Sequence, residues 1–241
     1  MIKFFRKIRQ RLIGEGNIKR YLIYAFGEVF LIIIGILIAL FISDWNNDRK
    51  LRKIEVENLK LIANGLQEDI SKIEYLKQQA RQRIDRLNVL DSLYKSPNPK
   101  YEPKMATLFG EIGWAETLEL NRGPYEGLKS QDLNLISDDS IRQGILHIYE
   151  TAHRQCETSN DWMKQSAINM WEPLMANFHL TTLNDLSPMD EKNIWKNPLI
   201  PNFISYQKGV LKEHQLDVFG RAQKEMIVLR DRINRHLAED D

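Results

Sequence analysis

Apolar residues are concentrated in one continuous segment near the start of the chain, at residues 21–42. The segment reads YLIYAFGEVFLIIIGILIALFI and contains a single charged residue, Glu28. At ~1.5 Å per residue, a helix of this length covers roughly 33 Å, about the thickness of the hydrocarbon core of a bilayer. The pattern predicts a transmembrane helix over residues 21–42, followed by a domain that is tethered to the membrane.

Residues 43–96 contain no proline and have the pattern of one long amphipathic helix that leaves the membrane. Its apolar residues recur about every 3.5 residues, which is the heptad interval. A coiled-coil dimer and a helix packed within its own bundle give the same spacing, and we favour the bundle because more helical segments follow. The apolar positions are Leu59, Ile62, Leu66, Ile70, Ile73, Leu76, Ala80, Ile84, Leu87, Leu90 and Tyr94.

Prolines at 97, 99 and 103 end this helix and divide it from residues 97–241. Periodic apolar residues predict further helices over residues 105–120, 125–130, 139–170 and 203–237, and Ser137, Asp138 and Asp139 form a typical N-terminal cap. Residues 180–201 predict a long irregular connection. Because strand-like alternation is missing, the expected fold class is all-α: one N-terminal transmembrane helix followed by an antiparallel helical-bundle domain.

The first 20 residues form a basic arm. Apolar residues recur at helical spacing in MIKFFRKIRQRLI, and most basic residues fall on other faces. We expect an amphipathic cytoplasmic helix in the headgroup layer of the lipid bilayer, and a docking peptide for a partner protein is the alternative. The basic residues that would contact the membrane surface are Lys3, Arg6, Lys7, Arg9, Arg11, Lys19 and Arg20.

The distribution of charge predicts the orientation of the span. Seven Lys/Arg residues precede the span within 20 residues, and five follow it within the same distance. By the positive-inside rule the N-terminus is cytoplasmic. We therefore expect a single-pass protein of the bacterial cell (inner) membrane whose C-terminal domain is extracytoplasmic, or periplasmic in a Gram-negative cell.

The chain has a net charge of +1, but the part that follows the predicted span is acidic. The part beyond the span holds 27 of the 34 basic residues and 31 of the 33 acidic residues. A domain that binds phosphates would show a basic excess instead. Nucleic acid is therefore not an expected partner.

Glu28 is the residue of the predicted span that is most indicative of a function, because placing an acidic side chain in a bilayer is energetically unfavourable. At ~100° per residue, Tyr24, Gly35 and Ala39 fall on the same helical face as Glu28. Gly35 and Ala39 form a small-xxx-small pair, which predicts self-association or pairing with a partner membrane protein through the span. The alternatives are a Glu28 that is protonated or reaches the interface, and a Glu28 that handles protons or ions.

Little in the sequence points to catalysis. The chain lacks G-x-S-x-G, H-E-x-x-H and Walker-type motifs, and we expect no catalytic residue, metal site or cofactor. The lone Cys156 cannot form an intramolecular disulfide and is expected to be a buried apolar-like side chain. His147, Glu150 and His153 are spaced by three, so the outer two point apart on a helix, and we expect surface or capping roles for them.

Three segments resemble an uncharacterised family of bacterial single-span membrane proteins, a domain of unknown function. These are MIKFFRKIRQRLI, the span segment YAFGEVFLIIIGILIAL with Gly27 and Glu28, and the exit SDWNNDRK. A later stretch, PYEGLKSQDLNLISDDSIRQGILHIYE, is similar to a second shared segment, although Gln131 follows Ser130 where a glycine is common. The resemblance implies the membrane layout and no activity.

Two classes of function are compatible with this layout. The first is a membrane-anchored, non-enzymatic interaction, scaffold or sensory module with an extracytoplasmic helical bundle. The alternative is a single-span auxiliary subunit of an ion-coupled, stator-like membrane complex that uses Glu28. An enzyme with a site dispersed over the bundle is a third hypothesis.

Overall fold

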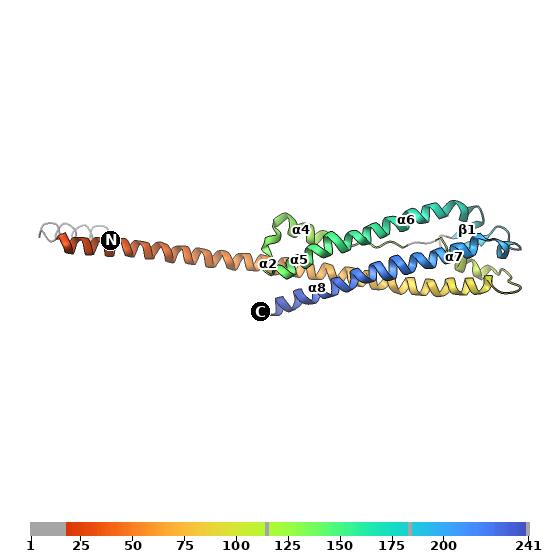
Figure 1. Cartoon of the computed structure of the whole chain (residues 1–241), viewed down its shortest axis with the longest axis horizontal. Helices are drawn as coiled ribbons and strands as arrows, with labels where there is room; N and C mark the ends of the chain where they lie inside the picture. Colours follow the sequence, from red (N-terminus) through yellow and green to blue (C-terminus); the bar gives the residue numbers. More distant parts are fainter. Residues whose placement is uncertain (1–17, 114–115, 183–184, 240–241) are drawn as a thin grey trace. The chain divides into compact units, whose positions relative to one another are not determined.

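The computed structural model describes residues 18–113, 116–182 and 185–239, except for the side chains of residues 18–21 and 24. These residues form mostly helices and one small two-stranded sheet (Figure 1). The chain divides into two compact units, Met1–Ile54 and Glu55–Asp241. The α-helices are α2 (Ile18–Tyr94), α3 (Ala106–Gly110), α4 (Gly123–Gln131), α5 (Asp139–His147), α6 (His153–Met175), α7 (Leu199–Val210) and α8 (Phe219–Glu239). The other elements are the 3-10 helices η1 (Pro103–Met105), η2 (Leu133–Leu135) and η4 (Ile194–Lys196), the π-helical segments η3 (Ile148–Ala152) and η5 (Leu211–Val218), and the strands β1 (Phe178–Thr182) and β2 (Asp185–Pro188).

In the first unit, α2 carries the apolar segment predicted to span a membrane. It is the one helix in the described part of the chain that is long and apolar enough to do so. Its large side chains are exposed, for example Phe26 and Phe41 at 75 % and 74 %. A soluble protein rarely exposes a continuous apolar surface of this kind, whereas side chains that face lipid are expected to be uncovered. Residues 1–17 of the predicted basic arm lie outside the described residues.

In the second unit, the predicted apolar stripe of α2 lies at the centre of the core. Leu59, Ile62, Leu66 and Ile73 are fully buried and pack against residues of α4, α5, α6 and α8. Further along α2, Leu87 and its neighbours pack against residues of α3, β1 and α7. The spacing read from the sequence therefore marks a face that is buried within this one chain.

Helix α8 runs antiparallel to α2. Arg230 donates a hydrogen bond to Gln67 at 2.6 Å, and Lys77 donates one to Gln223 at 2.6 Å. Positions later in α2 therefore contact positions earlier in α8. Figure 1 shows α8, in blue, beside the second half of α2.

Helices α5 and α6 run parallel to α2. The backbone N–H of Ser137, just before α5, donates to Glu55 at 2.7 Å, and His153 at the start of α6 lies 3.6 Å from Asp69. The segment between α2 and α5 must therefore carry the chain back along α2. Asp138 caps α5 by accepting a hydrogen bond from the N–H of Ile141 at 2.9 Å, which confirms the cap read from the sequence.

Residues 180–201 are not the long irregular connection that the sequence pattern predicted. Strands β1 and β2 pair antiparallel between Phe178 and Pro188, η4 follows, and α7 begins at Leu199. Each strand has only four or five residues, which is too short for alternation to stand out. The fold class is therefore mainly helical with a small sheet, rather than strictly all-α.

The helix predicted over residues 105–120 is much shorter. Helix α3 ends at Gly110, and the chain beyond it is held by a side chain instead. Asn160 of α6 accepts a hydrogen bond from the N–H of Leu118 at 2.9 Å and donates one to its carbonyl at 2.5 Å. This contact satisfies the backbone without a helix, and it joins residues too far apart in sequence for local periodicity to reveal.

Cys156 is buried in the core of the second unit, as predicted, and forms no disulfide. Burial, with smaller contributions from nearby carboxylates, raises the pKa of its thiol to about 12. The side chain behaves as a small apolar residue.

Substituting two isoleucines that differ in burial should have very different effects on the stability of the second unit. Ile73 on α2 is fully buried, whereas Ile168 on α6 is 66 % exposed. We expect Ile73→Ala to lower the free energy of unfolding by about 2–5 kcal/mol, because it removes buried apolar surface and leaves a cavity. Ile168→Ala is the matched control and should change it by no more than about 0.5 kcal/mol. Urea unfolding of the full chain in detergent measures both, and equal effects would contradict this assignment of the core.

Candidate functional site

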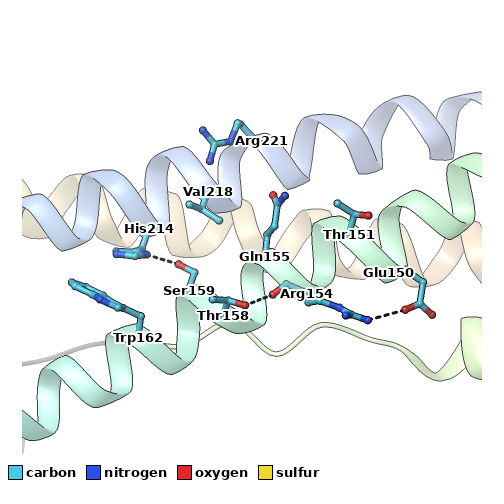
Figure 2. A pocket seen from close by; sticks show the side chains of 10 residues that line it. All are labelled: Glu150, Thr151, Arg154, Gln155, Thr158, Ser159, Trp162, His214, Val218 and Arg221. Atoms are coloured by element: carbon cyan, nitrogen blue, oxygen red, sulfur yellow. Dashed lines mark hydrogen bonds and ion pairs between the residues drawn. The ribbon is translucent and has the colours of Figure 1, made fainter.

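An open groove lies between α6 and the η5–α8 helix, with a volume of about 590 Å³ (Figure 2). We name it the α6–η5 groove. It is open to solvent rather than enclosed. Its lining residues are Glu150, Thr151, Arg154, Gln155, Thr158, Ser159, Trp162, His214, Val218 and Arg221.

Both π-helical segments of the second unit contribute to this groove. Glu150 and Thr151 come from η3, and His214 and Val218 come from η5. A π turn inserts one extra residue into a helix and changes which side chains face inwards, and such turns are frequent at functional sites. In η5, Gln215 is buried, and its amide donates to the carbonyl of Glu116 at 2.8 Å.

Aromatic rings form one end of the groove. The rings of Trp162 and His214 stack at 4.4 Å with an interplanar angle of 20°, and Tyr206 lies 6.1 Å from Trp162. The hydroxyl of Ser159 and Nδ1 of His214 are joined by a hydrogen bond of 2.6 Å (Figure 2). Burial lowers the pKa of His214, which favours its neutral form.

The Ser159 hydroxyl and Nδ1 of His214 lie at the distance of a nucleophile and its base. Ser159 lies inside α6, where the backbone N–H groups are used by the helix itself. Acyl transfer needs free donors that face the developing oxyanion, and the helix interior supplies none at Ser159. Within the described residues no three His, Cys, Asp or Glu side chains are placed to hold a metal ion.

Charged side chains border the groove. Arg154 donates to Glu150 at 3.2 Å, and Arg221 is exposed on the α8 side. Glu150 also accepts hydrogen bonds from the Tyr125 hydroxyl at 2.7 Å and from Lys129 at 3.2 Å. These two bonds lower the pKa of Glu150 and keep it ionised. Two arginines and one carboxylate that already has several donors give the groove a positive character.

A buried polar cluster lies behind Glu150 and corrects the expectation for His153. His153 is fully buried rather than at the surface, and its ring lies 4.5 Å from that of Tyr149. His147, by contrast, is exposed and pairs with Glu225 at 3.1 Å. The π-helical segment η3 lies between the two histidines, which occupy different faces as their spacing predicts, although His153 has no surface role.

Asp69 of α2 is the acid of this cluster and is also fully buried. Its carboxylate accepts two hydrogen bonds from the N–H of Asn121, at 2.9 and 3.1 Å, and Nε2 of His153 lies 3.6 Å away. Burial raises the pKa of Asp69. The same burial, with a smaller effect of the Arg122 charge, lowers the pKa of His153 to about 4.

Stacked tyrosines connect the buried cluster to the groove. The rings of Tyr125 and Tyr149 are parallel at 4.7 Å, and the Tyr125 hydroxyl reaches Glu150. Gly65 of α2 permits this packing, because a Cβ there would come within 3.1 Å of Pro124 and 3.8 Å of the Tyr149 hydroxyl. Apart from the PYEG segment itself, no sequence pattern indicated this arrangement.

The predicted residues of the span form a separate set. Glu28, Gly35 and Ala39 lie on α2, where Gly35 and Ala39 are exposed and a Cβ at Gly35 would meet nothing within 4 Å. The side chains of Tyr24, Lys19 and Arg20 lie outside the described residues, as do the other basic residues of the arm. Packing against a second span therefore stays a prediction.

These features define a mainly helical protein with one candidate membrane span and a groove on its helical body. The chain belongs to the Family of unknown function (DUF6090), whose family model matches residues 28–167. This confirms the expected membership of an uncharacterised family. The match includes Glu28, the buried cluster and the α6 side of the groove, while η5 and α8 lie beyond it. No curated protein and no solved structure matches the chain.

The buried His153 predicts that the protein loses stability in mild acid. Its folded pKa of about 4 lies below the ordinary value of 6.5, so between these values the unfolded chain binds more protons than the folded one. The contribution of His153 is fully present above pH 6.5 and is lost as the pH falls through about 4, by up to about 3 kcal/mol. The raised pKa of Asp69 acts in the opposite sense and offsets part of this loss.

Urea unfolding of the full chain in detergent at pH ~7 and ~4.5 measures this loss. We expect His153→Gln to reduce the difference between the two pH values by at least about 1 kcal/mol. The exposed His179 provides the control, since His179→Gln should leave the difference unchanged. An unaltered pH dependence in His153→Gln would show that this histidine is not held neutral by the fold.

Proposed function

We propose that this protein is a single-span, membrane-anchored binding module whose helical body lies outside the cytoplasm and binds a partner in the α6–η5 groove. The groove itself carries this proposal. It combines the Trp162–His214 aromatic pair with Arg154 and Arg221 in one open surface. Aromatic and arginine side chains are the residues that contribute most often to binding energy at interfaces.

The anchoring part of the proposal is supported by the exposed apolar run of α2 and by the basic residues on either side of it. The greater number of Lys and Arg before the run favours a cytoplasmic N-terminus. The pairing of α2 with α8 supports a helical bundle as the body. Gly35 and Ala39 would allow the close approach of another span.

A binding role fits the groove better than catalysis does. The backbone N–H groups around Ser159 are used by helix α6, and the buried cluster around Asp69 and His153 is closed off within the core. Open surfaces lined by aromatic and arginine side chains are suited to partners that contribute their own bulk to the contact.

Site-specific photo-crosslinking in the native membrane tests this function. A benzoylphenylalanine placed at Thr158, inside the groove, should form a defined adduct with a partner when the intact cells are irradiated. The same group at His179, an exposed position on β1, is the control and should not form that adduct. Trp162→Ala should reduce the Thr158 adduct by at least about tenfold, because it removes an aromatic anchor of the surface.

Lys164→Ala, an exposed α6 residue that does not line the groove, should leave the adduct unchanged. The proposal fails if Thr158 gives no more adduct than His179, or if Trp162→Ala and Lys164→Ala have equal effects.

The second candidate is an auxiliary subunit of an ion-coupled membrane complex, and the acid within the apolar run favours it. Under this hypothesis Glu28→Gln should abolish complementation of a deletion strain, while Glu28→Asp, which keeps the carboxylate, should retain it. Protein levels in the membrane are measured alongside. Full complementation by Glu28→Gln at normal levels would eliminate this candidate.

A further inference from the structure

A second surface of the same body carries charges opposite to those of the groove. It is a stripe on α2 that faces away from the core, and we name it the α2 outer stripe. Its six residues follow heptad steps of four and three and are all exposed: Glu57, Leu61, Asn64, Glu68, Ser71 and Tyr75. Leu61 and Tyr75 are 56 % and 58 % exposed, which is unusual for large apolar side chains at regular helical spacing.

The groove is long enough to hold one helix. Its α6 wall extends from Glu150 to Trp162, which is about 18 Å at ~1.5 Å per residue. Its two walls are neighbouring helices, and a third helix packs into such a groove with its axis ~8–10 Å from theirs. Because the groove is open, a small molecule would leave much of its surface in water, whereas small-molecule sites bury roughly 70–90 % of the ligand.

The charges of the two surfaces are complementary. The groove presents Arg154 and Arg221, and the α2 outer stripe presents Glu57 and Glu68 with no basic residue among its six. Three lysines border the stripe: Lys72 already donates to Asp69 and to the carbonyl of Glu119, and Lys53 and Lys60 are exposed. The apolar residues also correspond, since Leu61 and Tyr75 offer side chains to a groove that contains Trp162 and Val218.

We propose that the partner in the α6–η5 groove is the α2 outer stripe of a second copy of this chain. This inference rests on the proposed binding function of the groove and names its occupant. The two surfaces differ, so the contact is heterologous, and each copy has one groove and one stripe to offer. Copies in one membrane therefore associate head to tail, in a ring if the rotation closes and in a row if it does not.

Cysteine crosslinking of the full chain in membranes tests the pairing directly. In a Cys156→Ala background, one tagged copy carries Thr158→Cys in the groove and a differently tagged copy carries Ser71→Cys in the stripe. A bifunctional maleimide should join the two tags when the copies are co-expressed. Two copies that both carry Thr158→Cys should give at least about tenfold less product, because a heterologous contact does not bring groove to groove.

Charge reversal provides the stricter test. Arg154→Glu with Arg221→Glu in the first copy should lower the Thr158–Ser71 product at least about tenfold, because it places like charges together. Glu57→Arg with Glu68→Arg in the second copy should do the same. The two reversed copies together should restore the product, which also shows that both variants fold. Lys164→Glu is the control and should have no effect.

The proposal is overturned if the product is insensitive to the reversals, or if the two reversed copies do not restore it. A photo-adduct at Thr158 that contains a different protein would also overturn it while leaving the binding function intact. Absence of any groove-specific adduct would remove the binding function as well.

Discussion

The burial of one face of α2 is the constraint on which the second unit depends. The apolar residues between Leu59 and Leu90 contribute to both hydrophobic clusters, and every other long helix of the body packs against them. Because those residues repeat at close to the heptad interval, they form a nearly straight stripe, and partners can lie along it on either side. Helix α8 takes one side in the opposite direction, and α5–α6 take the other in the same direction.

Sequence patterns gave the parts of the fold that are set by local periodicity. The stripe of α2, the Asp138 cap and the buried Cys156 were all read correctly, because each depends on residues close together in the chain. Features decided by distant contacts were missed. The extended backbone at Leu118 is held by Asn160, and the short strands stabilise each other by antiparallel pairing. Neither contact leaves a periodic trace.

The groove was harder to foresee than the fold. Its aromatic end joins Trp162 and His214, which come from different helices, and its shape depends on two π turns. A π turn inserts one extra residue into a helix. A helical wheel that assumes a regular α-helix can therefore assign the wrong face to residues that follow it. His153 was expected at the surface, yet it is fully buried beside Tyr149. By contrast, the acid of the span was evident from composition alone, because a charge in an apolar run is conspicuous without any structure.

The burial of Cys156 affects how the second unit responds to the redox state of its surroundings. A thiol reacts with oxidants through its thiolate, and a thiol whose pKa is raised to about 12 has almost none at neutral pH. The only sulfhydryl of the chain is thus protected from both oxidation and mixed-disulfide formation. The cysteine of the folded body should therefore stay a free thiol in oxidising and in reducing surroundings alike.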